Sequence, residues 1–125
     1  MNNKCIFCDI SKDKILFETE YWKCIYDAFP VSTGHILAIL KRHEKNFFNL
    51  SKEELEDLNI RVIFKVKNII DNKFNPDGYN IGVNIGKSGG QTIDHCHIHI
   101  IPRYIGDCED PTGGVRGVIS NKQKY

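Results

Sequence analysis

The sequence predicts an α+β fold, in which a mostly antiparallel sheet packs against one long helix. Three observations lead to this prediction: two apolar stretches around a turn-rich segment, one long stretch with helical periodicity, and a short segment in which histidines alternate with small or apolar residues. Residues 1–125 are expected to form a single domain, because a chain of this length can bury one substantial core.

The first two strands are predicted over residues 20–26 and 34–40, where β-branched and aromatic side chains are common. Residues 27–33, which lie between them, contain the aspartate, proline and serine that favour turns. The two strands are therefore expected to be neighbours in the sheet.

A long helix is predicted next. Ser51, followed three residues later by Glu54, matches a capping box, which marks a helix N-terminus. Apolar residues then recur every three or four positions as far as Ile70. This spacing predicts one amphipathic helix that runs to about Asn72.

The second half of the chain predicts two more strands and a loop. Apolar and small or polar residues alternate over residues 79–85, which is typical of a half-buried strand. Residues 86–90 are rich in glycine and predict a loop, and the histidine segment after them is expected to be a strand that ends at Pro102. The tail from Asp107 is rich in turn residues.

Composition excludes several classes of function. The formal net charge is +1, so no global field attracts nucleic acid or an anionic membrane. No apolar run is long enough to cross a bilayer, and no signal-peptide core is found at the start, so a cytoplasmic location is expected. Five unevenly spaced cysteines fit free thiols and metal ligands better than a disulfide framework.

The histidine segment is the most informative part of the sequence. His95, His97 and His99 are spaced by two, so in a strand all three side chains would point to the same face. Three imidazoles on one face indicate a metal site, an anion site or a nucleophile with its helpers. An ordinary half-buried strand is the weaker alternative, because burying three unpaired polar rings is costly.

The loop before the histidines can bind an anion. Gly89, Gly90, Gln91 and Thr92 offer backbone N–H groups and one hydroxyl, which can form a nest for a phosphate. If the strand before this loop pairs with the histidine strand, Asn84 lies near the middle histidine. Together these residues indicate a phosphate held by amides in front of an imidazole.

His97, which has a histidine on each side, is therefore the candidate nucleophile, because neutral imidazole can attack phosphorus when its other nitrogen donates a hydrogen bond. His99 would position or neutralise the phosphate, and the loop amides with Thr92 would stabilise the developing charge. Asp27 follows an apolar strand, where it can cap a turn or accept bonds from the hydroxyls of a ribose.

Metal binding is a second possible role for histidines of the same segment. Cys5 and Cys8 form half of a structural zinc site, which His43 and His95 could complete as a Cys₂His₂ set. Two buried thiols without metal and a redox pair are the alternatives. A catalytic zinc held by the three histidines is a further hypothesis.

At these residues the chain resembles a known family. The run His95-x-His97-x-His99 followed by two aliphatic residues is the signature of the histidine triad family of nucleotide-binding hydrolases and transferases. The resemblance extends from the Cys5–Cys8 segment to residues 113–116, with Thr92 in place of the family's serine. It implies the histidine triad fold and a homodimer whose strands join into one continuous sheet.

The resemblance also implies an activity. His97 would form a covalent nucleotidyl-histidine that water hydrolyses, releasing a nucleoside monophosphate from a purine nucleoside phosphoramidate or a dinucleoside polyphosphate. A nucleotide-binding regulatory protein with incidental catalysis is the alternative. The implied site consists of His35, His97 and His99 for catalysis, Asp27, Asn84, Gly90, Gln91, Thr92, His99, Ile6, Phe7 and Ile25 for the nucleotide, and Cys5, Cys8, His43 and His95 for one structural zinc per chain.

Overall fold

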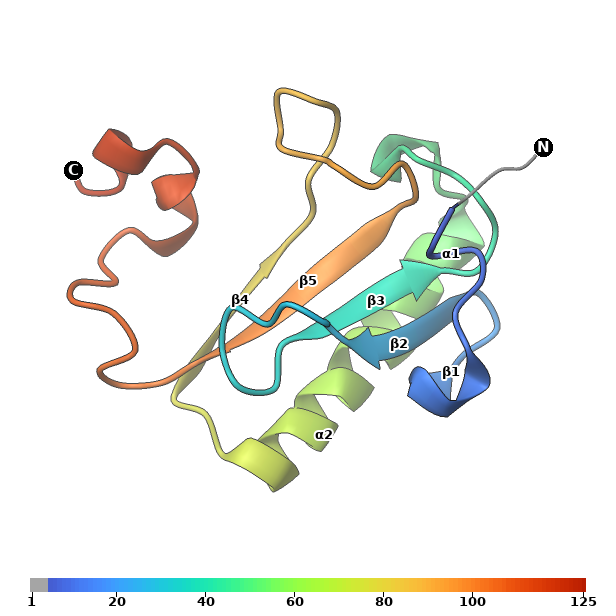
Figure 1. Cartoon of the computed structure of the whole chain (residues 1–125), viewed down its shortest axis with the longest axis horizontal. Coiled ribbons are helices and arrows are strands. Elements are labelled where there is room, and N and C mark those ends of the chain that lie inside the picture. Colours follow the sequence, from blue (N-terminus) through green and yellow to red (C-terminus); the bar gives the residue numbers. More distant parts are fainter. Residues whose placement is uncertain (1–4) are drawn as a thin grey trace.

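The computed structural model describes residues 5–125, and its centre is a five-stranded antiparallel sheet with a helical run across one face (Figure 1). The strands lie in the order β1-β2-β3-β5-β4. Their bounds are β1 Ile15–Glu18, β2 Trp22–Tyr26, β3 Ile36–Leu40, β4 Gly78–Gly82 and β5 His97–Arg103. The predicted fold class is confirmed.

The helical run consists of α1 (Lys52–Glu56) and α2 (Ile63–Phe74), joined by a π-helical stretch over Asp57–Val62. The buried carboxylate of Asp57 accepts hydrogen bonds from the Thr19 hydroxyl at 2.7 Å and the Tyr21 N–H at 3.0 Å. These bonds tie the run to the turn between β1 and β2. Within residues 5–125, no helix has both the length and the apolar character needed to cross a bilayer.

The ends of the helical run agree closely with the sequence. The Ser51 hydroxyl accepts the Glu54 N–H at 3.0 Å, and the Glu54 carboxylate accepts the Ser51 N–H at 2.8 Å, so the predicted capping box is confirmed. The run continues two residues past the predicted end at Asn72, to Phe74. It stops there because Asn75 adopts a left-handed backbone with φ of 52°.

Two layers of side chains meet at β3, which is buried along its whole length. Ile36, Ala38 and Leu40 pack in the cluster between the sheet and the helical run, whereas Leu37 and Ile39 pack with Phe7 on the opposite face. The same alternation continues on β5, where Ile98 and Ile100 join the helix-side cluster. His97 and His99 therefore lie on the other face of the sheet.

Several predicted strand limits were wrong. The four-residue strand β1, which has an irregular register against β2, was not expected. Strand β4 ends at Gly82 instead of residue 85, because the chain leaves the sheet before residues 86–90, the glycine loop. Strand β5 begins at His97, so His95 lies outside it. The tail contains two short 3₁₀ helices, Gly114–Val118 and Ser120–Lys122.

Candidate active site

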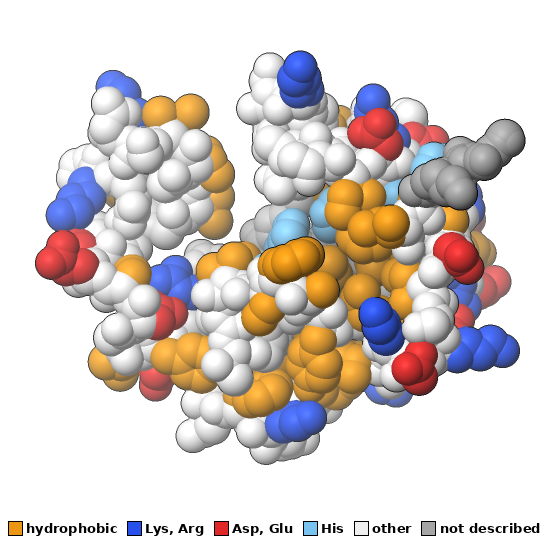
Figure 2. Space-filling view, viewed as in Figure 1, with side chains coloured by type: hydrophobic (Ala, Val, Ile, Leu, Met, Phe, Trp, Pro, Cys, Tyr) orange, Lys and Arg blue, Asp and Glu red, His pale blue; other side chains and the backbone are white. Residues whose placement is uncertain are grey.

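A pocket of about 930 Å³ lies on the face of the sheet opposite the helical run, and His97 and His99 both line it. Figure 2 shows histidine side chains in a hollow bordered by hydrophobic ones. The two rings are neighbours on β5, with centroids 5.2 Å apart. The prediction that alternate residues of this strand share one face is correct for these two histidines.

The proton on the His97 ring is fixed by a backbone carbonyl. Nδ1 of His97 lies 2.8 Å from the carbonyl oxygen of His95, and a carbonyl can only accept a hydrogen bond. Nδ1 must therefore carry the proton, which leaves Nε2 of the neutral ring with a lone pair. His97 is 8% exposed, so this ring has little freedom to rearrange.

The proton on the His99 ring is fixed by a chain of two bonds. The Val31 N–H donates to Nδ1 of His35 at 3.0 Å, so the proton of His35 lies on Nε2. That nitrogen is 3.0 Å from Nδ1 of His99, to which it donates. Nδ1 of His99 is therefore the acceptor, and Nε2 of the neutral ring carries a proton. Nε2 of His97 therefore has a lone pair, whereas Nε2 of His99 has a proton to donate.

Burial keeps the two supporting rings neutral. Desolvation lowers the pKa of His99 to about 4, with a further contribution from the neighbouring His97 and His35. Desolvation also lowers the pKa of His35, partly offset by Asp27. Both rings are therefore uncharged at neutral pH, as the hydrogen-bond chain requires.

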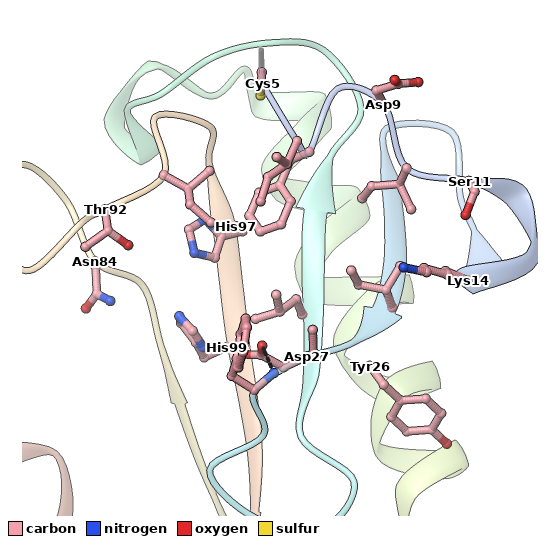
Figure 3. A pocket seen from close by; sticks show the side chains of 18 residues that line it. Cys5, Asp9, Ser11, Lys14, Tyr26, Asp27, Asn84, Thr92, His97 and His99 are labelled. Atoms are coloured by element: carbon pink, nitrogen blue, oxygen red, sulfur yellow. Dashed lines mark hydrogen bonds between the residues drawn. The ribbon is translucent and has the colours of Figure 1, made fainter.

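Asp27 lies at the end of β2 and lines the pocket beside His99 (Figure 3). One carboxylate oxygen accepts the Phe29 N–H at 3.0 Å, and the other lies 3.5 Å from Nε2 of His35. The carboxylate thus caps a turn, as one reading of the sequence predicted. It also faces the cavity, where it can accept bonds from ligand hydroxyls.

The glycine loop brings Asn84 and Thr92 to the pocket, where Figure 3 places them across from the histidines. Gly90 has φ of 90°, a conformation that favours glycine. Gln91 does not line the pocket: its side chain accepts the Gly86 N–H at 3.1 Å and donates to the carbonyls of Lys45 and Ile93. Gln91 therefore holds the loop in shape.

Apolar side chains form the rest of the pocket. The predicted Ile6, Phe7 and Ile25 all line it, whereas the predicted Gly90, Gln91 and His35 do not. Sequence reasoning missed several lining residues, and for Leu37 the alternation along β3 could have indicated the correct face. The missed residues are Asp9, Ile10, Ser11, Lys14, Tyr26, Ala28, Phe29, Leu37 and Ile93.

A second cluster consists of Cys5, Cys8, His43 and His95, whose donor atoms all lie within 4.8 Å of one another. Nδ1 of His95 lies 3.3 Å from Sγ of Cys5, 3.5 Å from Sγ of Cys8 and 3.2 Å from Nδ1 of His43. Zn–N bonds of about 2.0–2.1 Å and Zn–S bonds of about 2.3 Å would separate tetrahedral donors by about 3.3–3.8 Å. The four residues fit a zinc ion.

His95 belongs to this cluster and does not line the pocket, although its ring contacts Phe7 on the same face of the sheet as His97. The chain turns just before β5, where the His95 N–H donates to the carbonyl of Ile93 and the Cys96 N–H donates to that of Glu44. The His95 ring then donates from Nε2 to the carbonyl of Leu40 at 2.6 Å, and Nδ1 keeps the lone pair that a metal needs.

The same arrangement disfavours a catalytic zinc held by three histidines. Among residues 5–125, the only other group of possible ligands combines Asp27 with His35 and His99, whose facing ring nitrogens already bond each other. Nδ1 of His97 is held by a carbonyl. The three triad histidines do not bring their donor atoms together.

Comparisons with known proteins show the family of the chain. The HIT domain family matches residues 10–106, so the chain belongs to that family. It is 37% identical over 101 residues to the bis(5'-adenosyl)-triphosphatase of Dictyostelium discoideum, covering 81% of this chain and 67% of the relative. It is 38% identical over 103 residues to the adenosine 5'-monophosphoramidase of Schizosaccharomyces pombe, covering 79% and 74%.

Solved structures show the same fold. A HIT family protein from Bacillus anthracis superposes with a TM-score of 0.76 at 35% identity, covering 86% of this chain and 78% of that one. A Zn-bound histidine triad family protein from Mycobacterium smegmatis superposes with a TM-score of 0.73 at 30% identity, covering 83% and 78%. The expected histidine triad fold is confirmed.

Proposed function

We propose that this protein hydrolyses nucleotides at the α-phosphate through a covalent nucleotidyl-histidine on His97. The observation that carries the proposal is the opposite proton placement on two adjacent rings of one pocket. His97 keeps a lone pair on Nε2, and His99 keeps a proton on Nε2. One ring is suited to attack phosphorus and the other to bind a phosphoryl oxygen.

The first chemical step breaks the bond between phosphorus and the leaving group. Nε2 of His97 donates its electron pair to phosphorus, and the leaving amine or phosphate departs with its bonding pair and takes a proton from solvent. The His97 ring becomes cationic, and its Nδ1–H stays bonded to the carbonyl of His95, which stabilises the charge. His99 and Thr92 donate to the phosphoryl oxygens.

The second step releases the product. A water molecule attacks phosphorus, loses a proton to solvent, and displaces His97, which recovers its lone pair. The product is a nucleoside monophosphate. Because the same carbonyl holds the ring through both steps, the nucleophile is returned in the proton state in which it began.

The rest of the pocket binds the nucleoside. The apolar wall that contains Phe7 and Ile25 packs against a purine base, and Asp27 accepts bonds from the ribose hydroxyls. Asn84 and the loop that ends at Thr92 lie at the phosphate end. The names of the two relatives above support adenosine phosphoramidates and diadenosine polyphosphates as the substrate classes.

One structural zinc ion per chain is held by Cys5, Cys8, His43 and His95. The metal joins the Cys5–Cys8 segment to His43, which follows β3, and to His95, which precedes β5. We also propose that two copies form a homodimer whose strands join into one continuous sheet, which sedimentation velocity can test. A cytoplasmic location stays a prediction.

The direct test is AMP release from adenosine phosphoramidate and from diadenosine tetraphosphate. We expect turnover of at least one substrate, and undiminished turnover in the control variant Cys108→Ser, whose thiol is exposed and outside the pocket. No hydrolysis of either substrate and no binding of AMP would overturn the proposal. Tight AMP binding without hydrolysis would instead support the regulatory alternative.

A further inference from the structure

Residues 5–10 form one wall of the pocket, yet few polar contacts hold them in place. Within the described chain, every hydrogen bond that joins residues 5–10 to other segments involves the thiol of Cys5 or Cys8. The one backbone bond of this segment, from the Cys8 N–H to the carbonyl of Cys5, is internal. Apart from apolar packing, the wall is therefore held by the ligand cluster.

Phe7 lies between Cys5 and Cys8 in the sequence, and its ring contacts the His97 ring. The Phe7 side chain is buried and packs with Leu37 and Ile39 of β3. Its ring meets the His97 ring edge to face, with centroids 4.9 Å apart and an interplanar angle of 71°. Rotation of the imidazole about χ2 would drive it against Phe7.

The other restraint on His97 also leads to the cluster. Its Nδ1–H donates to the carbonyl of His95, whose ring is itself a candidate ligand. The Phe7 ring also lies edge to face with the His95 ring, with centroids 6.0 Å apart. Two of the contacts on the His97 ring, from Phe7 and from the carbonyl of His95, thus come from segments that hold candidate metal ligands.

We propose that Phe7 is a positioning residue for His97, and that zinc binding acts on catalysis by holding Phe7 against the nucleophile. With zinc bound, the loop from Cys5 to Cys8 is closed and the imidazole has one orientation and one tautomer. Without zinc, this wall is held by packing alone, and His97 samples other orientations. The kinetic part rests on the proposed function, whereas the coupling itself does not.

The kinetic experiment compares zinc-loaded Phe7→Ala and Phe7→Leu with Phe64→Ala, which removes an exposed phenyl ring on α2, outside the pocket. For Phe7→Ala we expect kcat to fall about 10- to 100-fold with zinc content unchanged. The change in KM should be smaller, and Phe7→Leu should recover part of kcat. Phe64→Ala should leave kcat and KM within about threefold of wild type, because this ring lies outside the pocket. A Phe7→Ala enzyme with wild-type kcat would overturn the proposal.

The spectroscopic experiment follows the ring ¹⁵N shifts of His97 by NMR in zinc-loaded wild type, zinc-free wild type and zinc-loaded Phe7→Ala. We expect a single Nδ1–H tautomer in the first and averaged shifts in the other two. Identical His97 shifts in all three, or a protein that binds no zinc, would overturn the proposal. If the zinc-free protein unfolds, the Phe7→Ala comparison decides. This experiment needs no turnover, so failure of the proposed function is seen separately.

Discussion

His95 and His97 are separated by one residue, yet their imidazoles are prepared for different chemistry. His95 donates from Nε2 to the carbonyl of Leu40, so Nδ1 faces the two thiols. His97 donates from Nδ1 to the carbonyl of His95, so Nε2 keeps a lone pair in the pocket. The difference teaches that backbone carbonyls, and not the residue type, set which ring nitrogen of each histidine keeps its lone pair.

The largest effect should come from separating these two roles by mutation. We expect His97→Asn to lower kcat by at least about 10³-fold, because it removes the nucleophile, while zinc content stays near one per chain. His95→Asn should instead lose zinc, since a neutral amide is a poor substitute for imidazole. Elemental analysis with steady-state kinetics measures both. Full zinc content in His95→Asn would contradict the assignment.

Metal removal should affect stability before it affects chemistry. We expect chelation to lower Tm by about 10–20 °C, because a metal bound only by the folded state stabilises it by several kcal/mol. Calorimetry with and without chelator measures the shift. The zinc-free protein that stays folded should still turn over faster than His97→Asn. Equal loss of activity in the two would favour a catalytic metal.

Acid should lower the free energy of unfolding through protonation of His99, which lines the pocket. Its pKa is about 4 when folded, against an unfolded value of 6.5, so as pH falls the unfolded state takes up the proton first. The stability is complete above about pH 6.5 and is lost as pH falls toward 4. We expect a loss of about 2 kcal/mol between pH 7 and pH 5.

Urea unfolding of wild type and His99→Asn at both pH values isolates this contribution. Titration of the zinc ligands is common to the two proteins and cancels in the difference. We expect the stability of wild type to fall further than that of the variant. Equal losses in the two proteins would show that His99 is not neutralised by burial.

The smallest effect should come from a site that belongs to neither cluster. Ser51→Ala removes the hydroxyl that caps α1, which should lower the free energy of unfolding by about 1 kcal/mol. Zinc content and kcat should match wild type, because the helical run packs on the opposite face of the sheet. A change in kcat larger than twofold would mean that the two faces are coupled.

The sequence predicted the elements with strong periodicity. The helix start, β2, β3 and the face shared by His97 and His99 follow from local patterns. Strand β1 was missed because four residues with an irregular register leave little pattern to read. The helix end was nearly correct, although nothing in the apolar spacing signalled the left-handed Asn75.

The site was harder to predict, because its decisive contacts join distant segments. His95 meets Cys5, Cys8 and His43 only in the folded chain, because these residues are far apart in the sequence. The four candidate zinc ligands could be proposed from residue type, yet the contact between Phe7 and His97 could not. Alternation along a strand gives the face of a side chain, but the hydrogen bonds that fix its proton come from the folded chain.

The central claim is that His97 attacks phosphorus, and trapping the intermediate tests it most directly. The protein is mixed with adenosine phosphoramidate, quenched in alkali within one turnover, digested and mapped by mass spectrometry. We predict an AMP adduct on His97 that is absent from His97→Asn and present in Cys108→Ser. An adduct on another residue, or AMP release by His97→Asn at the wild-type rate, would contradict the account.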